Sequence, residues 1–81
     1  MALGLDGKDN SGRPRQAYAD KLAALDDAAF EDEAKQAIWL SAYASNNPRS
    51  DYHWHADACY SEAERRGRPE LYERAWKRAA A

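Results

Sequence analysis

The side chains that pack best in β-sheets are nearly absent from this chain. It contains no valine and no threonine, and Ile38 is its only isoleucine. Strands are normally filled with such β-branched residues because they pack well on a pleated surface. Alanine is instead the commonest residue, and glutamate, lysine, arginine and leucine add further strong helix formers. The sequence therefore predicts an all-α fold.

Eighty-one residues allow one domain with a thin hydrophobic core. Leucine is scarce, so the apolar bulk must come from three tryptophans, five tyrosines and one phenylalanine. Each of these aromatic side chains removes roughly 150–250 Å² from water when it is enclosed. A core of this kind can hold one small bundle together, and we expect modest stability or an oligomeric partner.

Capping residues and apolar spacing predict four helices. Pro14 suits the first position of a helix, and Ser50 suits an N-cap. Pro48 and Gly67 interrupt the pattern, because proline lacks an amide hydrogen and glycine favours the left-handed end of a helix. Together with apolar residues three and four apart, these signals place helices at about 14–25, 27–45, 51–66 and 69–80.

Short loops between these helices predict antiparallel neighbours. We expect residues 14–81 to form a single domain, a compact three- to four-helix bundle of antiparallel helical hairpins. The helix at 27–45 is apolar on more than one side and should be central. The inner face of the helix at 51–66 is predicted to contain Tyr52, Ala56, Cys59, Tyr60 and Ala63. Residues 1–13, rich in glycine and polar side chains, are predicted to be a flexible N-terminal tail.

Catalytic signatures are missing from the sequence, which holds no glycine-rich phosphate loop and no serine in a nucleophile elbow. His55 and Cys59 lie four residues apart and could share a metal ion or form a nucleophile pair. A structural zinc site needs four ligands, however, and the chain has only two histidines and one cysteine. We therefore expect no cofactor and no enzymatic activity, and keep a metal-dependent dimer through His55 and Cys59 as a distant alternative.

Charge is distributed unevenly although the net charge is only −2. Residues 20–33 hold six acidic side chains against one lysine. Residues 65–81 hold six basic side chains against two acidic ones. The basic set could contact nucleic acid, with nearby aromatic rings stacking on bases; it comprises Arg65, Arg66, Arg68, Arg74, Lys77 and Arg78. The two patches could equally face each other within the fold, or pair between subunits.

Trp54 lies off the predicted inner face of its helix, among polar neighbours. Either the first helix or the N-terminal tail covers it, or it is exposed as an anchor for a partner. The predicted partner-binding residues are Trp54, His53, Asp57, Arg65, Arg68, Tyr72 and Trp76.

A non-catalytic protein–protein interaction module is the leading functional hypothesis, and a small nucleic-acid-binding protein is the alternative. Small, charge-polarised helical proteins without catalytic motifs are often accessory or inhibitory factors, including those of phages and mobile elements; this step is analogy.

No leader sequence opens the chain, and no run approaches the roughly 20 apolar residues of a membrane helix. We expect a cytoplasmic protein that binds a protein partner or itself, without a membrane.

Overall fold

The computed structural model describes residues 7–80. Within that range the chain forms four α-helices and no strand, which confirms the predicted all-α fold. The helices are α1 (Arg15–Ala24), α2 (Asp27–Tyr43), α3 (Asp51–Arg65) and α4 (Pro69–Ala80). Their bounds agree with the predicted ones to within two residues, and the largest difference is at the end of α2.

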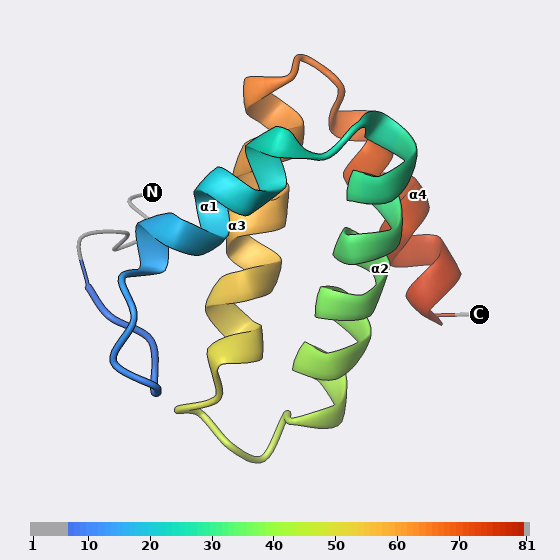
Figure 1. The fold of residues 1–81 in the computed structure, drawn as a ribbon. Coiled ribbons are helices and arrows are strands. Elements are labelled where there is room, and N and C mark those ends of the chain that lie inside the picture. Colours follow the sequence, from blue (N-terminus) through green and yellow to red (C-terminus); the bar gives the residue numbers. More distant parts are fainter. Residues whose placement is uncertain (1–6, 81) are drawn as a thin grey trace.

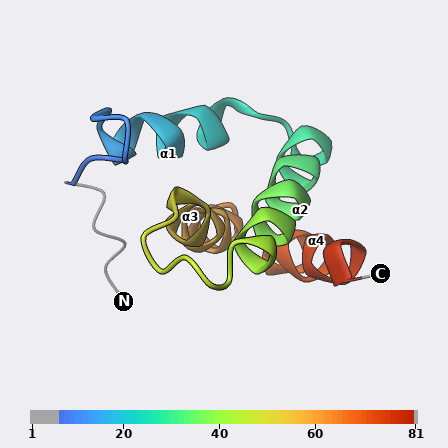
Figure 2. The same ribbon diagram turned by 90° about the horizontal axis from the view of Figure 1, so that it is seen from below.

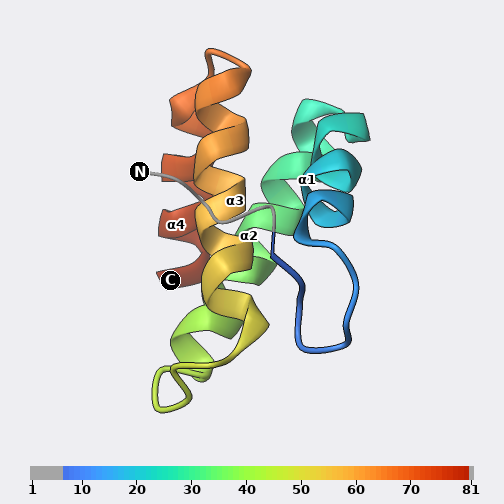
Figure 3. The ribbon, with the colours of Figure 1, turned by 90° about the vertical axis from the view of Figure 1, so that its left-hand side faces the viewer.

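Helices α2 and α3 form an antiparallel hairpin, and the other two helices pack on it from opposite sides (Figures 1 and 2). Helix α4 packs mainly on α2 and also contacts α3, whereas α1 packs on α3. Seen from the side in Figure 3, α3 stands between α1 and α4. Helix α2, which was predicted to be central, packs on α3 and α4, whereas α3 packs on all three other helices.

A side-chain cap fixes the start of α2, and a glycine fixes the end of α3. The Asp26 side chain accepts a hydrogen bond from the amide of Ala29 at 2.8 Å, at the N-terminus of α2. At the C-terminus of α3, Gly67 has a φ of 69°. This left-handed residue lets the amide of Arg68 bond to the carbonyl of Ala63 at 2.9 Å, so α3 stops and the chain turns into α4.

The core lies where α2, α3 and α4 meet, with Leu22 added from α1. Its largest fully buried side chains are Phe30, Leu22, Leu71 and Cys59, and alanines fill the space between the helices. Small side chains let the helix axes approach closely. The core is therefore built from a few large groups set among alanines.

Two of the predicted inner residues of α3 are on the surface instead. Tyr52 and Tyr60 are exposed, whereas Trp54, Ala58 and Glu62 are buried. The reason is that α1 packs on a second face of α3, next to the face that α2 and α4 cover. A single-stripe interpretation of this helix was wrong because α3 is enclosed on two sides.

Arg66 joins the ends of three helices. Its guanidinium donates hydrogen bonds to the carbonyls of Leu22 at 2.7 Å and Leu25 at 2.6 Å. It also pairs with the carboxylates of Asp27 at 2.8 Å and Glu62 at 2.7 Å. The same group lies over the ring of Phe30, 4.6 Å from its centroid. Arg66 thus ties the end of α1 and the start of α2 to the last turn of α3.

The segment before α1 is bound to the start of α3. Asn10 donates its amide to the carboxylate of Asp51 at 3.1 Å, and its side chain donates to the carbonyl of Arg49 at 2.8 Å. The prediction of a flexible tail at residues 1–13 therefore has a different outcome for each of two segments. Residues 1–6 lie outside the described residues, and residues 7–13 form a turn that contacts the α2–α3 loop and α3.

Candidate functional site

Four of the seven predicted partner-binding residues line one groove. His53 and Asp57 of α3 face Tyr72 and Trp76 of α4 across it. The remaining lining residues come from α2 and α3: Ile38, Ser41, Ala42 and Ala56. The groove is open and has a volume of about 420 Å³. We call it the α2–α3–α4 groove.

Local structure explains why the groove exists. Leu71 and Ala75 bury one face of α4 against the core, so Tyr72 and Trp76 are carried on the neighbouring face, four residues apart. Tyr72 is half-buried and packs edge-on against Tyr60, with 5.3 Å between the ring centroids. Trp76 is 55% exposed. The aromatic wall of the groove is thus set by the register of α4 on the core.

His53 is held in place by two hydrogen bonds of its own. Its Nε2 atom lies 2.9 Å from the carbonyl of Asn47, and its Nδ1 atom lies 2.7 Å from the Ser41 hydroxyl. A carbonyl can only accept, so Nε2 donates, and in the neutral ring Nδ1 accepts from Ser41. His53 therefore joins the α2–α3 loop to α2 and presents a fixed ring edge to the groove.

The other polar groups of the groove have no partner among the described residues. Asp57 is exposed and forms no ion pair within residues 7–80, and neither the Tyr72 hydroxyl nor the Trp76 indole nitrogen makes a hydrogen bond there. Burial raises the pKa of Tyr72, and the nearby Cys59 and Asp57 add to this rise. The groove thus combines two aromatic side chains with one carboxylate that has no ion-pair partner among residues 7–80.

Trp54, the residue on which the predicted interface depended most, lies elsewhere. It is only 8% exposed, and α1 covers it. Tyr18 packs edge-on against its ring at 5.6 Å between centroids, the Arg15 guanidinium lies 5.0 Å from its centroid, and its indole donates to Asp51 at 2.9 Å. Of the alternatives for Trp54, the structure selects coverage by the first helix.

The two arginines of the predicted site also lie away from the groove. Arg65 pairs with Glu62 at 2.6 Å. Arg68 pairs with Asp27 at 2.7 Å and with Glu70 at 2.8 Å. Both are at the opposite end of α3, near the turn into α4.

The acidic and basic patches face each other within the fold. Glu31 of α2 accepts from Arg74 at 2.9 Å and from Arg78 at 2.8 Å, and Arg78 also bonds to Asp32. A hydrogen bond from Arg74, and a smaller contribution from the hydrogen bond of Arg78, hold the pKa of Glu31 below its ordinary value. Arg65, Arg66 and Arg68 are paired as described above. Of the six basic residues in the predicted nucleic-acid set, Lys77 alone forms no ion pair with any residue from 7 to 80.

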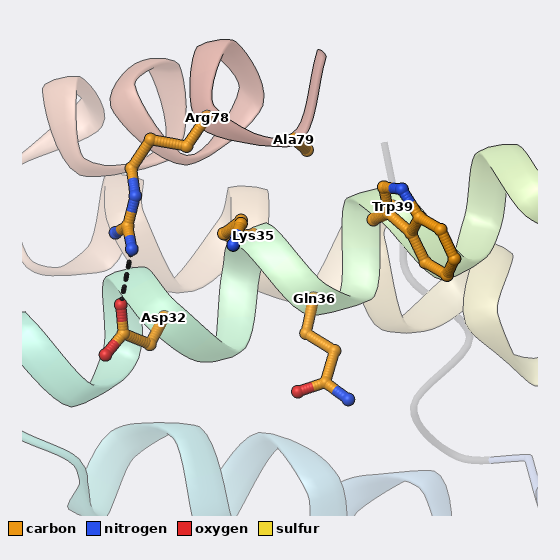
Figure 4. A pocket seen from close by; sticks show the side chains of 6 residues that line it. All are labelled: Asp32, Lys35, Gln36, Trp39, Arg78 and Ala79. Atoms are coloured by element: carbon orange, nitrogen blue, oxygen red, sulfur yellow. Dashed lines mark hydrogen bonds and ion pairs between the residues drawn. The ribbon is translucent and has the colours of Figure 1, made fainter. Parts of the chain in front are cut away.

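A second hollow lies on the other side of α4 and is lined by α2 and α4 (Figure 4). The Arg78–Asp32 ion pair closes one end of it, and Trp39 stands at the other end while Gln36 points away from α4. Trp39 is 51% exposed and stacks on Tyr43, with 5.5 Å between the ring centroids. Of the two cations that line this hollow, Arg78 is paired with Glu31 and Asp32, and Lys35 forms no ion pair within residues 7–80. The hollow contains none of the predicted partner-binding residues.

His55 and Cys59 are both packed beneath α1. His55 stacks on Tyr18 at 4.0 Å between ring centroids, and the buried Cys59 sulfur lies 3.7 Å from the Tyr18 hydroxyl. That hydroxyl donates to Glu33 at 2.8 Å, so the thiol is the donor to Tyr18. Burial raises the pKa of Cys59 to about 12, so the thiol stays protonated at neutral pH. Residues 7–80 contain no cluster of three metal-ligating side chains.

The stability of the fold is expected to fall as the pH drops below about 6.5, because of His55. Burial lowers the pKa of His55 from its ordinary 6.5, against the opposing effect of nearby carboxylates. The charged groups around it are Asp51, Glu33 and Asp9, which raise this pKa, and Lys21, which lowers it. The unfolded chain then binds a proton more readily than the folded one, so stability is full above pH 6.5 and is lost as pH falls towards the folded pKa.

Thermal unfolding between pH 7.5 and 5.5 measures this effect. The melting temperature of the wild type should decrease over this interval, and His55→Gln should flatten the decrease. Hydrogen bonds from arginines lower the pKa values of Glu31, Glu62 and Glu70, so these three carboxyl groups titrate below this interval and do not mask the effect. An unchanged slope in His55→Gln would contradict the assignment.

Sequence reasoning missed the α2 wall of the groove. In the sequence, Ile38 and Ser41 continue the helical spacing of the core residues Phe30, Ala34 and Ala37, yet both are half-buried and line the groove. A residue at the edge of a helical stripe has the same spacing as one at its centre, so periodicity alone does not separate them. The polar Ser41 at the end of an apolar stripe was the one available signal.

None of the helices formed by residues 7–80 is long and apolar enough to cross a membrane. Comparison of the chain with protein-family models, with curated proteins and with solved structures finds no match.

Proposed function

We propose that this protein is a non-catalytic protein-interaction module, a small accessory or inhibitory factor that docks on a larger partner through the α2–α3–α4 groove. The observation that carries the proposal is the position of Trp76 and Tyr72. Both stand on the wall of an open groove beside a carboxylate with no ion pair among residues 7–80.

Exposed tryptophan and tyrosine in a concave site are the side chains that most often dominate a protein interface. Each removes a large apolar area from water while losing little conformational freedom, since only two side-chain torsions are fixed. Leu71 and Ala75 already anchor α4 to the core. Trp76 is therefore not needed to hold α4 in place and is available to a partner.

The nucleic-acid alternative gains no specific support. Phosphate binding requires cations that are free to replace counterions. In this fold the arginines of α4 are engaged by α2, and those at the end of α3 are engaged by Glu62 and Asp27.

Affinity capture from the native cells, with and without nuclease, tests the proposal. Replacement of Trp76 by alanine should reduce recovery of the bound protein by at least 10-fold, because loss of an interface anchor costs about 2 kcal/mol or more. Trp39→Ala is the matched control, since Trp39 is equally exposed but lies outside the groove. Nuclease should leave the recovery unchanged.

Two results would count against this function. One is a folded Trp76→Ala protein that captures the same partner as the wild type. The other is capture that disappears with nuclease treatment, which would favour the nucleic-acid alternative. Circular dichroism of each variant establishes that the protein is folded.

A further inference from the structure

We propose that the α2–α3–α4 groove receives a cationic side chain, above all an arginine, from an otherwise apolar segment of the partner protein. This inference rests on the proposed function and deepens it by naming the chemistry of the partner. The feature behind it is the placement of Asp57 across the groove from Tyr72 and Trp76.

Charge complementarity indicates the kind of partner. Among the described residues, the acidic side chains at the α2–α4 contact are already paired with arginines: Asp27, Glu31 and Asp32. Asp57 has no such pair within residues 7–80 and is exposed on the wall of the groove. A cation from outside can therefore bind it without displacing an internal one.

The two rings beside Asp57 favour arginine as that cation. A guanidinium group is planar, can bond to a carboxylate through two parallel hydrogen bonds, and stacks well on aromatic faces. Trp76 is 55% exposed, so part of its surface is open to such stacking. Ile38 and Ala42 add an apolar surface for the methylene groups of the same side chain or for a neighbouring residue.

The remaining charges near the groove do not cancel this preference. Glu73 and Lys77 flank Trp76 on α4 in an adjoining hollow and are four residues apart in the favourable order, so their charges balance each other. His53 faces the groove with both ring nitrogens hydrogen-bonded to Asn47 and Ser41. Asp57 is thus the charge that remains to select a ligand.

A second copy of the chain is a less suitable occupant. The arginines of α3, of α4 and of the turn between them are held in internal ion pairs, so among residues 7–80 a neighbouring copy could supply a cation without breaking one only from elsewhere, as from Arg13, Lys35, Arg49 or Lys77. Sedimentation equilibrium of the wild type at micromolar concentration should therefore show a monomer.

Selection from a phage-displayed library of random 12-residue peptides tests the proposal. Peptides enriched on the wild type should carry arginine, or less often lysine, next to an aromatic or aliphatic residue. A synthetic peptide from this set should bind on the order of 10-fold more weakly to Asp57→Asn, the effect of losing one charge-assisted contact. Glu64→Gln makes the same change in charge at an exposed position of α3 outside the groove, and should bind like the wild type.

The possible outcomes distinguish a failure of the cation proposal from a failure of the proposed docking function. Peptides that need Trp76 but carry no basic residue would overturn the cation proposal and leave the groove as the docking site. The same is true if Asp57→Asn binds the basic peptides as tightly as the wild type. Peptides that bind Trp76→Ala undiminished, or a dimer that excludes all peptides, would overturn both.

Discussion

Replacement of Arg66 by alanine is expected to destabilise the fold by about 3–5 kcal/mol, the usual cost of removing one partner from a buried ion pair. Arg66 is only 11% exposed and Glu62 is 7% exposed. The substitution also leaves the carbonyls of Leu22 and Leu25 without their donor and removes the cation from the face of Phe30. A small domain has only about 5–15 kcal/mol of stability, so much of it would be lost.

Urea unfolding followed by circular dichroism at 222 nm measures this loss. Arg65→Ala is the matched control, because Arg65 binds the same carboxylate of Glu62 but is 61% exposed. The two variants carry the same net charge, and Arg65→Ala should shift the unfolding midpoint only slightly. Equal effects of the two substitutions would contradict the role given to Arg66 as the joint between α1, α2 and α3.

Replacement of Trp54 by alanine is expected to cost about 3–5 kcal/mol of stability, as is typical for a large aromatic side chain removed from a core. The loss has a clear origin. The space under α1 would empty, Tyr18 and Arg15 would lose the ring on which they pack, and Asp51 would lose the indole donor. Helix α1, which contacts α3 through this region, should be the first to separate.

Trp76→Ala is the matched comparison for Trp54→Ala, since the same atoms are removed from an exposed site. Surface substitutions generally change stability by no more than about 0.5 kcal/mol. The two variants should therefore have opposite phenotypes: Trp54→Ala weakens the fold, and Trp76→Ala weakens partner binding in a folded protein. A Trp54→Ala protein that melts with the wild type and loses its partner would reverse this assignment.

The lengths and ends of the helices could be predicted from the sequence because their causes are local. Asp26 and Ser50 cap helices through bonds to amides within three residues, and Gly67 stops α3 by its own backbone conformation. The lack of valine and threonine excluded a sheet without reference to any distant contact.

The exposure of the aromatic residues could not be predicted in the same way. Trp54 has polar neighbours in sequence, and Tyr60 has the spacing of a core residue, yet Trp54 is buried and Tyr60 is exposed. Which face of α3 is covered depends on where α1 packs, and that contact joins residues about 40 positions apart, as in the hydrogen-bond contact of Tyr18 with Cys59.

The charged residues likewise have one property that could be predicted from the sequence and one that could not. The sequence established that residues 20–33 are acidic and residues 65–81 are basic, but a pairing within the fold and a free basic surface were both compatible with that pattern. Tertiary packing decided it, because α4 lies along α2 and brings Arg74 and Arg78 to Glu31.

The all-α fold and the bounds of its helices were thus determined by the sequence itself, since propensity and capping act over a few residues. The groove of His53, Asp57, Tyr72 and Trp76, and the burial of Trp54, were decided only by the tertiary structure, since both depend on which helix faces pack together.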